Sequence, residues 1–379
     1  MDRNSSGIML RVNALSKLYR SQPGQVAGGV REATFDVPQG AFFTLLGPSG
    51  CGKTTTLRCV AGLESPDVGS IAIDGETVFD AGNYIETPVN KRNIGMVFQS
   101  YAIWPHMTVY ENAIFPLKVT RRKRYSRDDI KRRARSALET VGLGGFEARS
   151  ATQLSGGQQQ RLALARAIIH EPALLLLDEP LSNLDVKLRE EMRVELKRLQ
   201  QQVGITAIYV THDQGEALAL SDTIAIMENG NIVQYGTPDE IYHAPANRFV
   251  AGFVGTTNFI DGRVAGVLAN AKELSVEIAD GTLLSCRAPQ SPVSVGQAVT
   301  ICVRPESIRM AATSGEGASA NRLSGRISSK TFLGNTTVHY VAVGGHVMQV
   351  MSNPDAVHAP NAAVDLHIPS ERIVILPKA

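Results

Sequence analysis

Gly47-Pro48-Ser49-Gly50-Cys51-Gly52-Lys53-Thr54 follows the apolar run Phe42 to Leu46 and leads into a stretch of helical character. A buried strand, a glycine-rich turn and a helix in this order are typical of a phosphate-binding loop. The glycines allow successive backbone N–H groups to curl around an anion, and the start of the helix adds a positive dipole. A glycine-rich turn that binds no ligand is the alternative.

The side chains of this loop have separate predicted roles. Lys53 would reach the terminal phosphates of a nucleotide, and Thr54 would place its hydroxyl on Mg²⁺. We expect Thr55, the next helical residue, to contact the nucleotide as well. Cys51 lies inside the loop, so a bulky adduct on its sulfur should block nucleotide binding.

Length and composition set broad limits. The 379 residues allow two or three domains, and a formal net charge of +2 gives no whole-chain argument for nucleic-acid binding. The start of the chain is polar and no apolar run approaches the roughly 20 residues that span a bilayer, so any work at a membrane should go through a partner. The four cysteines have no metal-ligand spacing, which favours reduced thiols.

Polar residues follow three further apolar runs that we expect to be strands of the same sheet. Gln99 follows Ile94 to Phe98, Asp178 and Glu179 follow Ala173 to Leu177, and His212 follows Thr206 to Val210. Such strand ends meet at the ligand-binding edge of an α/β sheet. Asp178 would hold Mg²⁺ through water, Glu179 would polarise the attacking water, and Gln99 would contact Mg²⁺ or position water.

A second anion site is predicted at a helix start. The sequence Leu154-Ser155-Gly156-Gly157-Gln158 places a good N-cap residue, Ser155, before two glycines that allow close approach to the backbone. One chain thus carries two predicted anion sites but a single Lys-Thr loop.

These motifs, in this order over roughly the first 235 residues, resemble the nucleotide-binding subunit of ABC transporters. The resemblance implies ATP and Mg²⁺ as cofactors, and a head-to-tail dimer in which Ser155, Gly156, Gly157 and Gln158 of one copy contact the phosphates held by the other. It also implies roles for single residues: adenine stacking for Tyr19, coupling to the membrane partner for Gln99, the catalytic base for Glu179, a terminal-phosphate contact for His212, and communication across the dimer for Asp185.

Two predictions concern the region before the loop. The alternation of apolar and polar residues from Ile8 to Leu18 predicts an edge strand of an antiparallel layer. The composition between Tyr19 and Val30, rich in Gly, Gln and Ser, predicts an exposed loop.

The C-terminal part reads as short alternating strands with glycine turns, which predicts a small β-barrel. Val303 to Ile308 and Phe332 to Asn335 are similar to the OB-like (TOBE) regulatory domain of importer ATPases for sugars, polyamines, ferric iron and molybdate. The resemblance implies an α/β P-loop NTPase with a RecA-like core, an antiparallel β subdomain and a helical subdomain at about residues 100–165, followed by the all-β barrel. The expected domains are residues 1–236, a helical linker at 237–257, and 258–379.

Other classes are less consistent with the sequence. An ABC-type ATPase acting on nucleic acid would show aromatic residues and a basic groove on the barrel, and this chain lacks that footprint. An exporter would usually carry a fused membrane span. Nine basic residues between Arg121 and Arg135 would suit anionic lipid or an acidic partner, although a solvated helix face is the simpler explanation.

The resemblance therefore implies an ATPase that powers solute import as a homodimer on the cytoplasmic face of the inner membrane. It would dock on transmembrane permease subunits through the region between Gln99 and Leu154, serve a substrate-binding protein indirectly, and bind no nucleic acid. Ser100 to His106 looks most like the ferric-iron and polyamine branches. We take ferric iron as the first expectation and a polyamine or sugar as the alternative.

Overall fold

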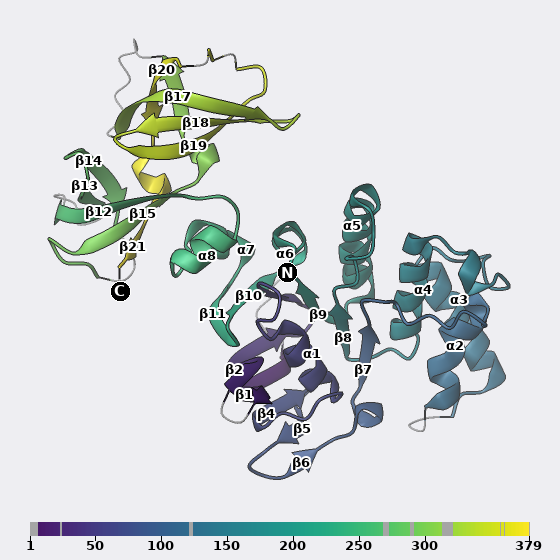
Figure 1. Cartoon of the computed structure of the whole chain (residues 1–379). Coiled ribbons are helices and arrows are strands. Elements are labelled where there is room, and N and C mark those ends of the chain that lie inside the picture. Colours follow the sequence, from purple (N-terminus) through teal and green to yellow (C-terminus); the bar gives the residue numbers. More distant parts are fainter. Residues whose placement is uncertain are drawn as a thin grey trace. The chain divides into compact units, whose positions relative to one another are not determined.

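The computed structural model describes residues 7–22, 25–120, 124–267, 273–288, 292–312, 321–356, 358–359 and 361–378. The chain divides into two units, Met1–Pro238 and Asp239–Ala379, which are described separately. Figure 1 shows the elements of both, coloured along the sequence. No helix among the described residues is long and apolar enough to cross a membrane.

A six-stranded sheet forms the centre of the first unit. Its strands are β3 (Phe42–Leu46), β7 (Ile94–Val97), β8 (Leu174–Asp178), β9 (Thr206–Thr211), β10 (Thr223–Glu228) and β11 (Asn231–Gly236). They lie in the order β11-β10-β3-β9-β8-β7, and all neighbours are parallel except the β10–β11 hairpin. The carboxyl ends of β3, β7, β8 and β9 therefore share one edge of the sheet.

Both faces of this sheet are buried, as the continuous apolar runs predict. Leu174 and Leu176 of β8 belong to one core, and Leu175 and Leu177 to the other. The first core holds α1 (Lys53–Ala61) against an antiparallel sheet, and the second holds α5 (Val186–Val203) and the helical region. The short helix α6 (Gln214–Leu220) follows β9.

The antiparallel sheet corrects both predictions for the start of the chain. Its strands are β1 (Ile8–Gln22), β2 (Gln25–Pro38), β4 (Val68–Ile73), β5 (Glu76–Asp80) and β6 (Ile85–Glu86), in the order β2-β1-β4-β5-β6. β1 pairs on both sides, so it is not an edge strand. The predicted loop after Tyr19 is a continuation of the β1–β2 hairpin, with Tyr19 opposite Gly28. Pro23 and Gly24 lie outside the described residues.

Three helices make up the helical region: α2 (Val109–Val119), α3 (Arg127–Thr140) and α4 (Gly156–Ile168). Thr108 and Ser155 begin α2 and α4 with capping boxes, in which the N-cap side chain and the side chain at the third helical position bond reciprocally to the backbone. Arg121 to Lys123, part of the predicted basic cluster, lie outside the described residues. Within the described part, Arg132 pairs with Asp129, and Arg133 pairs with Glu171.

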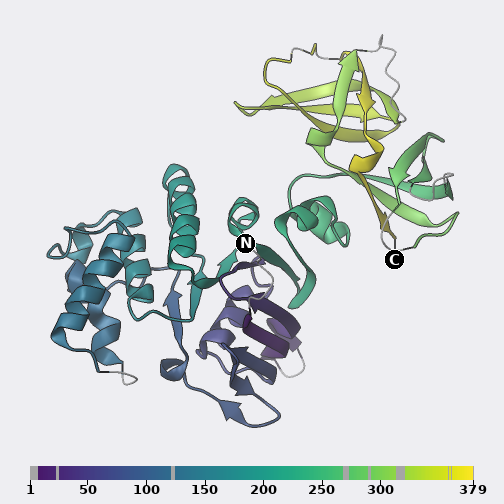
Figure 2. The same ribbon diagram turned by 180° about the vertical axis from the view of Figure 1, so that it is seen from behind.

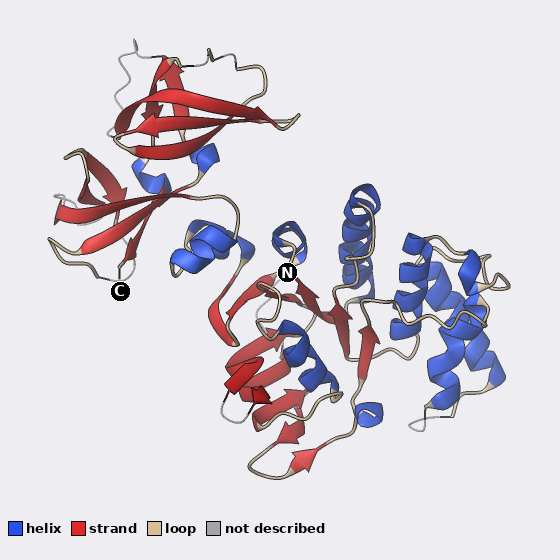
Figure 3. Ribbon diagram, viewed as in Figure 1, coloured by secondary structure: helices blue, strands red, loops and turns tan. Residues whose placement is uncertain are grey.

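The second unit is mainly strand, as Figure 3 shows in red. It begins with two short helices, α7 (Pro238–His243) and α8 (Arg248–Phe253). One antiparallel sheet has the order β14-β13-β12-β15-β21 and the other β16-β20-β17-β18-β19. The strands are β12 (Asn258–Val267), β13 (Glu273–Ile278), β14 (Leu283–Arg287), β15 (Ala298–Val303), β16 (Arg309–Ala312), β17 (Arg322–Phe332), β18 (Thr337–Val343), β19 (His346–Ser352), β20 (Ala363–His367) and β21 (Ile373–Pro377).

Both sheets share one apolar core. Asn258 on β12 joins them directly, because its side chain donates to the carbonyl of Gln349 at 2.8 Å and accepts from the amide of the same residue at 2.7 Å. Arg304 holds the short helices to this unit by donating to the carbonyls of Tyr242 and Ala251 at 3.0 and 3.1 Å. The fold class predicted from the sequence, an α/β unit with a glycine-rich loop between a buried strand and a helix followed by an all-β unit, is confirmed.

A buried arginine fixes the end of α1 and provides a test of this fold. Arg92 donates to the carbonyls of Cys59 and Val60 at 2.7 and 2.8 Å and to that of Thr87 at 2.9 Å, and burial lowers its pKa. We expect Arg92→Met to lower the free energy of unfolding by about 2–4 kcal/mol, because it leaves buried carbonyls unpaired. Urea denaturation followed by circular dichroism measures the change.

Arg11→Met is the matched control for that experiment. Arg11 also pairs with another residue, Asp36, but both side chains are largely exposed. Its loss should change the free energy of unfolding by no more than about 0.5 kcal/mol. Equal effects of the two substitutions would contradict the structural role given to Arg92.

Candidate functional site

The loop between β3 and α1 has the backbone that its glycines predict. Gly50 and Gly52 have φ angles of 81° and 104°, which favour glycine. The buried Lys53 side chain turns back over the loop and donates to the carbonyls of Gly47 and Pro48 at 2.7 and 2.9 Å. The cation is thus held at the centre of the loop, where an anion would be cradled by backbone N–H groups.

Strands β2 and β10 pack closely against this loop, a contact that no sequence motif predicts. A Cβ on Gly52 would lie 2.5 Å from the carbonyl oxygen of Gly29, and a Cβ on Gly47 would lie 2.3 Å from that of Met227. The amide of Gly230 donates to the carbonyl of Cys51 at 3.2 Å. The Asn229-Gly230 turn is readable from sequence, but its approach to the loop depends on the tertiary fold.

Thr54 and Asp178 meet as predicted for a magnesium site. The Thr54 hydroxyl donates to an Asp178 carboxylate oxygen at 3.2 Å. Burial raises the pKa of Asp178, and the Thr54 hydrogen bond opposes that shift. A buried carboxylate beside a hydroxyl, next to a phosphate-binding loop, fits Mg²⁺, which takes few protein oxygens and completes its shell with phosphates and water.

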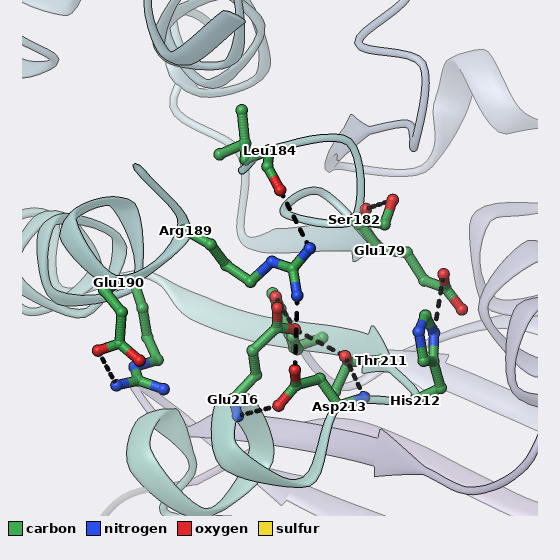
Figure 4. Close-up of polar contacts among 11 residues, drawn as sticks. Glu179, Ser182, Leu184, Arg189, Glu190, Thr211, His212, Asp213 and Glu216 are labelled. Carbon is green, nitrogen blue, oxygen red and sulfur yellow. Dashed lines mark hydrogen bonds and ion pairs between the residues drawn. The ribbon is translucent and has the colours of Figure 1, made fainter. Parts of the chain in front are cut away.

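Glu179 and His212 form the second pair at this edge. The Nδ1 atom of His212 lies 3.2 Å from a carboxylate oxygen of Glu179 (Figure 4). Glu179 has a φ of 44°, a strained value for this residue type, and its amide donates to the carbonyl of Val210 at 3.0 Å. The Glu179 side chain is mostly buried and that of His212 is half exposed. The pair therefore lies at the surface of this sheet edge, where a ligand could reach it from solvent.

A buried carboxylate below this pair was missed by the sequence analysis. Glu216 is 4% exposed and accepts from the hydroxyls of Tyr209 and Thr211 at 2.8 and 2.6 Å. Burial, followed by the nearby Glu216 charge, raises the pKa of Tyr209 well above its usual value. This network anchors the end of β9, from which His212 projects. Its members are spread over β9 and α6, and no local motif marks them.

Three predicted residues lie at the periphery. Gln99 is exposed, and its carbonyl accepts from the Asn183 side chain at 2.8 Å. Tyr19 is 40% exposed, and its hydroxyl donates to Glu64. Burial raises the pKa of the Tyr19 hydroxyl, with the Glu64 hydrogen bond acting in the same direction. Asp185 caps α5 by accepting from the Leu188 amide at 3.0 Å.

The helix start predicted as a second anion site has the expected capped backbone, but it does not lie near the phosphate-binding loop. Ser155 accepts from the Gln158 amide, and a Cβ on Gly157 would touch Leu188 at 3.1 Å. Figures 1 and 2 both show α4 grouped with α2 and α3, away from α1 and the phosphate-binding loop. Ser155, Gly156, Gly157 and Gln158 therefore lie apart from Lys53 within a single chain.

Comparisons with known families give two matches. Residues 30–182 match the ABC transporter family, and residues 301–376 match the TOBE domain. The first match contains the phosphate-binding loop, the Ser155 helix start and the Asp178-Glu179 strand end. The second lies in the all-β unit.

Similar proteins agree with these matches. The spermidine/putrescine import ATP-binding protein of Acidothermus cellulolyticus is 47% identical over 336 residues, which are 89% of this chain and 84% of that protein. The trehalose/maltose import ATP-binding protein of Thermococcus litoralis is 54% identical over 234 residues, 61% and 62% of the two chains. A solved dimeric ATP-binding cassette with bound ADP and phosphate is 30% identical with a TM-score of 0.52, covering 61% of this chain and 99% of that one.

The thiol inside the loop allows a test of the site. Cys51 is 4% exposed, and burial raises its pKa, so little reactive thiolate forms near neutral pH. All four cysteines are free and buried. We expect iodoacetamide at pH 7.5 to alkylate Cys51 more than about tenfold more slowly in the native protein than in guanidinium chloride. Mass spectrometry of timed samples gives both rates.

Cys51→Ser serves as the control. It should lose one of the four adducts that form in denaturant and leave the slow native reaction of the others unchanged. Rapid native labelling that disappears in Cys51→Ser would show that the loop is more open than the structure places it.

Proposed function

The chain belongs to the family of ATP-binding subunits of ABC importers that carry a C-terminal TOBE domain, and from this premise we propose that it powers the import of a polyamine. As a member of this family the chain is an ATPase. The polyamine assignment is supported by relatives named for spermidine and putrescine import that span 89% of the chain, including its C-terminal unit.

A sugar is the second candidate substrate. The relative named for trehalose and maltose import is the more identical one, at 54%, but it aligns with only 61% of the chain. These relatives favour the alternative substrates over ferric iron, which the sequence analysis put first, and nothing in them supports iron.

The proposed chemistry uses the residues at the carboxyl edge of the sheet. Backbone N–H groups of the loop, with Lys53, bind the terminal phosphates, whose oxygens replace the loop carbonyls that Lys53 contacts at 2.7 and 2.9 Å. Glu179 orients the attacking water and His212 contacts the terminal phosphate. Thr54 and Asp178 would hold Mg²⁺, and Gln99 would contribute to the same ion or position water. The ion, when bound, supplies charge neutralisation on the phosphate oxygens.

The proposed working form is a head-to-tail pair of copies. Its support is the separation, within one chain, of the Ser155 helix start from the phosphate-binding loop. In the pair, Ser155 to Gln158 of one copy would complete the site built on Lys53 of the other, and Asp185 would lie near the shared boundary. The similar solved cassette is a dimer. Tyr19 would stack on the adenine.

We assign the region between Gln99 and Leu154 to the permease contact, at the inner face of the membrane. Trp104 is 41% exposed there and packs against Phe115, with ring centroids 5.5 Å apart. An exposed aromatic of this size is suited to a partner surface. A substrate-binding protein would act through the permease.

Glu179→Gln is the first test of this chemistry. Removing the carboxylate should lower kcat by about 10²–10⁴-fold and leave ATP binding intact. The variant should then accumulate as an ATP-bound dimer. Size-exclusion chromatography with and without ATP and Mg²⁺ measures the shift.

Adding Ser155→Arg to this variant provides the control. A bulky cation at the second anion site should abolish the nucleotide-dependent dimer without affecting ATP binding to the loop. A dimer that persists would arise from another surface, and wild-type turnover by Glu179→Gln alone would remove Glu179 from the mechanism.

Substrate identity requires the whole transporter. In cells lacking this chain, uptake of labelled spermidine, maltose and ferric iron should be compared with and without the gene supplied in trans. We expect only spermidine uptake to depend on the chain, and uptake should fail with Glu179→Gln. Dependence of maltose uptake instead would establish the sugar alternative.

A further inference from the structure

Arg189, in the first turn of α5, contacts two segments that carry the Glu179–His212 pair. Its guanidinium donates to the carbonyl of Leu184 at 3.0 Å through Nη2, and Nη1 lies 3.8 Å from Asp213 Oδ2. Figure 4 shows this side chain between the turn that precedes α5 and the segment that follows β9. No sequence motif singles it out.

The turn before α5 controls the backbone of Glu179. Ser182 donates to the Glu179 carbonyl through its amide at 3.2 Å and through its hydroxyl at 2.9 Å. Glu179 has a left-handed φ of 44°, which persists only where neighbouring contacts enforce it. This turn also contains Leu184. A displacement of the turn would therefore change the position of the Glu179 carboxylate.

The other contact of Arg189 is with Asp213, the residue that follows His212. Asp213 follows His212 directly, donates its amide to the Thr211 hydroxyl at 2.9 Å, and accepts from the Glu216 amide at 3.0 Å. These bonds fix Asp213 to the start of α6. The contacts thus form a closed ring, because Glu179 and His212 meet again at 3.2 Å.

Arg189 is the adjustable member of this ring. Its separation from Asp213 is longer than a hydrogen bond, and its buried Nε atom has no partner among the described residues. Buried N–H groups are nearly always paired. The guanidinium can therefore move closer to the Asp213 carboxylate and form a two-point contact in which Nε is the second donor.

We propose that Arg189 is a positioning residue that sets the geometry of the Glu179–His212 pair by joining the turn before α5 to Asp213. The inference rests on the proposed roles of Glu179 and His212 in hydrolysis. Since the same turn leads into Asp185, which would lie at the boundary with the second copy, Arg189 connects dimer closure to the reacting groups.

The test is steady-state ATPase kinetics of the full chain with Arg189→Met. Because a displacement of about 1 Å costs on the order of 10²-fold in rate, kcat should fall about 10–100-fold. KM for ATP should stay within about threefold of wild type, because Arg189 contacts no residue of the phosphate-binding loop in the described structure. A loss confined to KM would overturn the proposal.

Two further variants separate positioning from general damage to α5. Arg193→Met removes a neighbouring arginine that pairs with Glu190 at 2.6 Å, and it should retain kcat within about twofold. Arg189→Lys should recover part of the lost rate, because one ammonium group reaches a single acceptor at a time. Equal losses in Arg189→Met and Arg193→Met would contradict the inference.

A double-mutant cycle covers the case in which Arg189→Met does not fold. Asp213→Asn keeps the N-cap of α6 and removes the charge, so it can be combined with Arg189→Lys. The two changes should be strongly non-additive in kcat, whereas additive effects would overturn the coupling. If the wild-type chain itself had no ATPase activity, the proposed function would be refuted. Failure of the proposed function is thus distinguishable from failure of the Arg189 proposal.

Discussion

The pairing register of β8 with β9 is the constraint on which the site depends. Asp178 lies opposite Val210, and the chain then continues through Glu179 and His212 on adjacent strand ends. The bond from the Glu179 amide to the Val210 carbonyl extends this pairing past the end of β8. A slip of one residue would turn these side chains to the other face of the sheet, so the apolar residues that fix the register also fix the chemistry.

The parts of the fold that local sequence determines were predicted well. The β3 strand, the glycine loop and α1 follow from an apolar run, positive-φ positions and a helix start that lie within twenty residues. Ile8 to Leu18 was rightly predicted as a strand of an antiparallel sheet, but its edge position was wrong because β1 also pairs with β4, which lies far along the chain. The loop predicted from Tyr19 to Val30 was wrong because the β1–β2 hairpin continues through it. Gly28 and Gly29, read as loop residues, have φ angles of 151° and 127° and lie within the β1–β2 hairpin. Composition alone does not distinguish a glycine-rich strand from a loop.

The positions of the candidate site residues could be predicted where a sequence motif exists, but not where they depend on contacts between distant parts of the chain. The Thr54–Asp178 hydrogen bond links residues 124 positions apart, yet both lie in recognisable motifs. Gly29 and Arg189 lie in no such pattern, because their roles arise only from the approach of β2 to the loop and of α5 to the end of β9. The substrate could not be predicted from this site, because in the proposed complex the residues that bind the substrate would lie on the permease and the substrate-binding protein.

The distance between the Ser155 helix start and the phosphate-binding loop has a kinetic consequence. In the proposed head-to-tail pair, the site would be assembled in a second-order process, so the specific activity of the free subunit would rise with its own concentration. Attachment of two copies to one permease would replace that encounter by a high effective local concentration. ATP hydrolysis would then occur largely in assembled transporters, and free subunits at low concentration would hydrolyse ATP slowly.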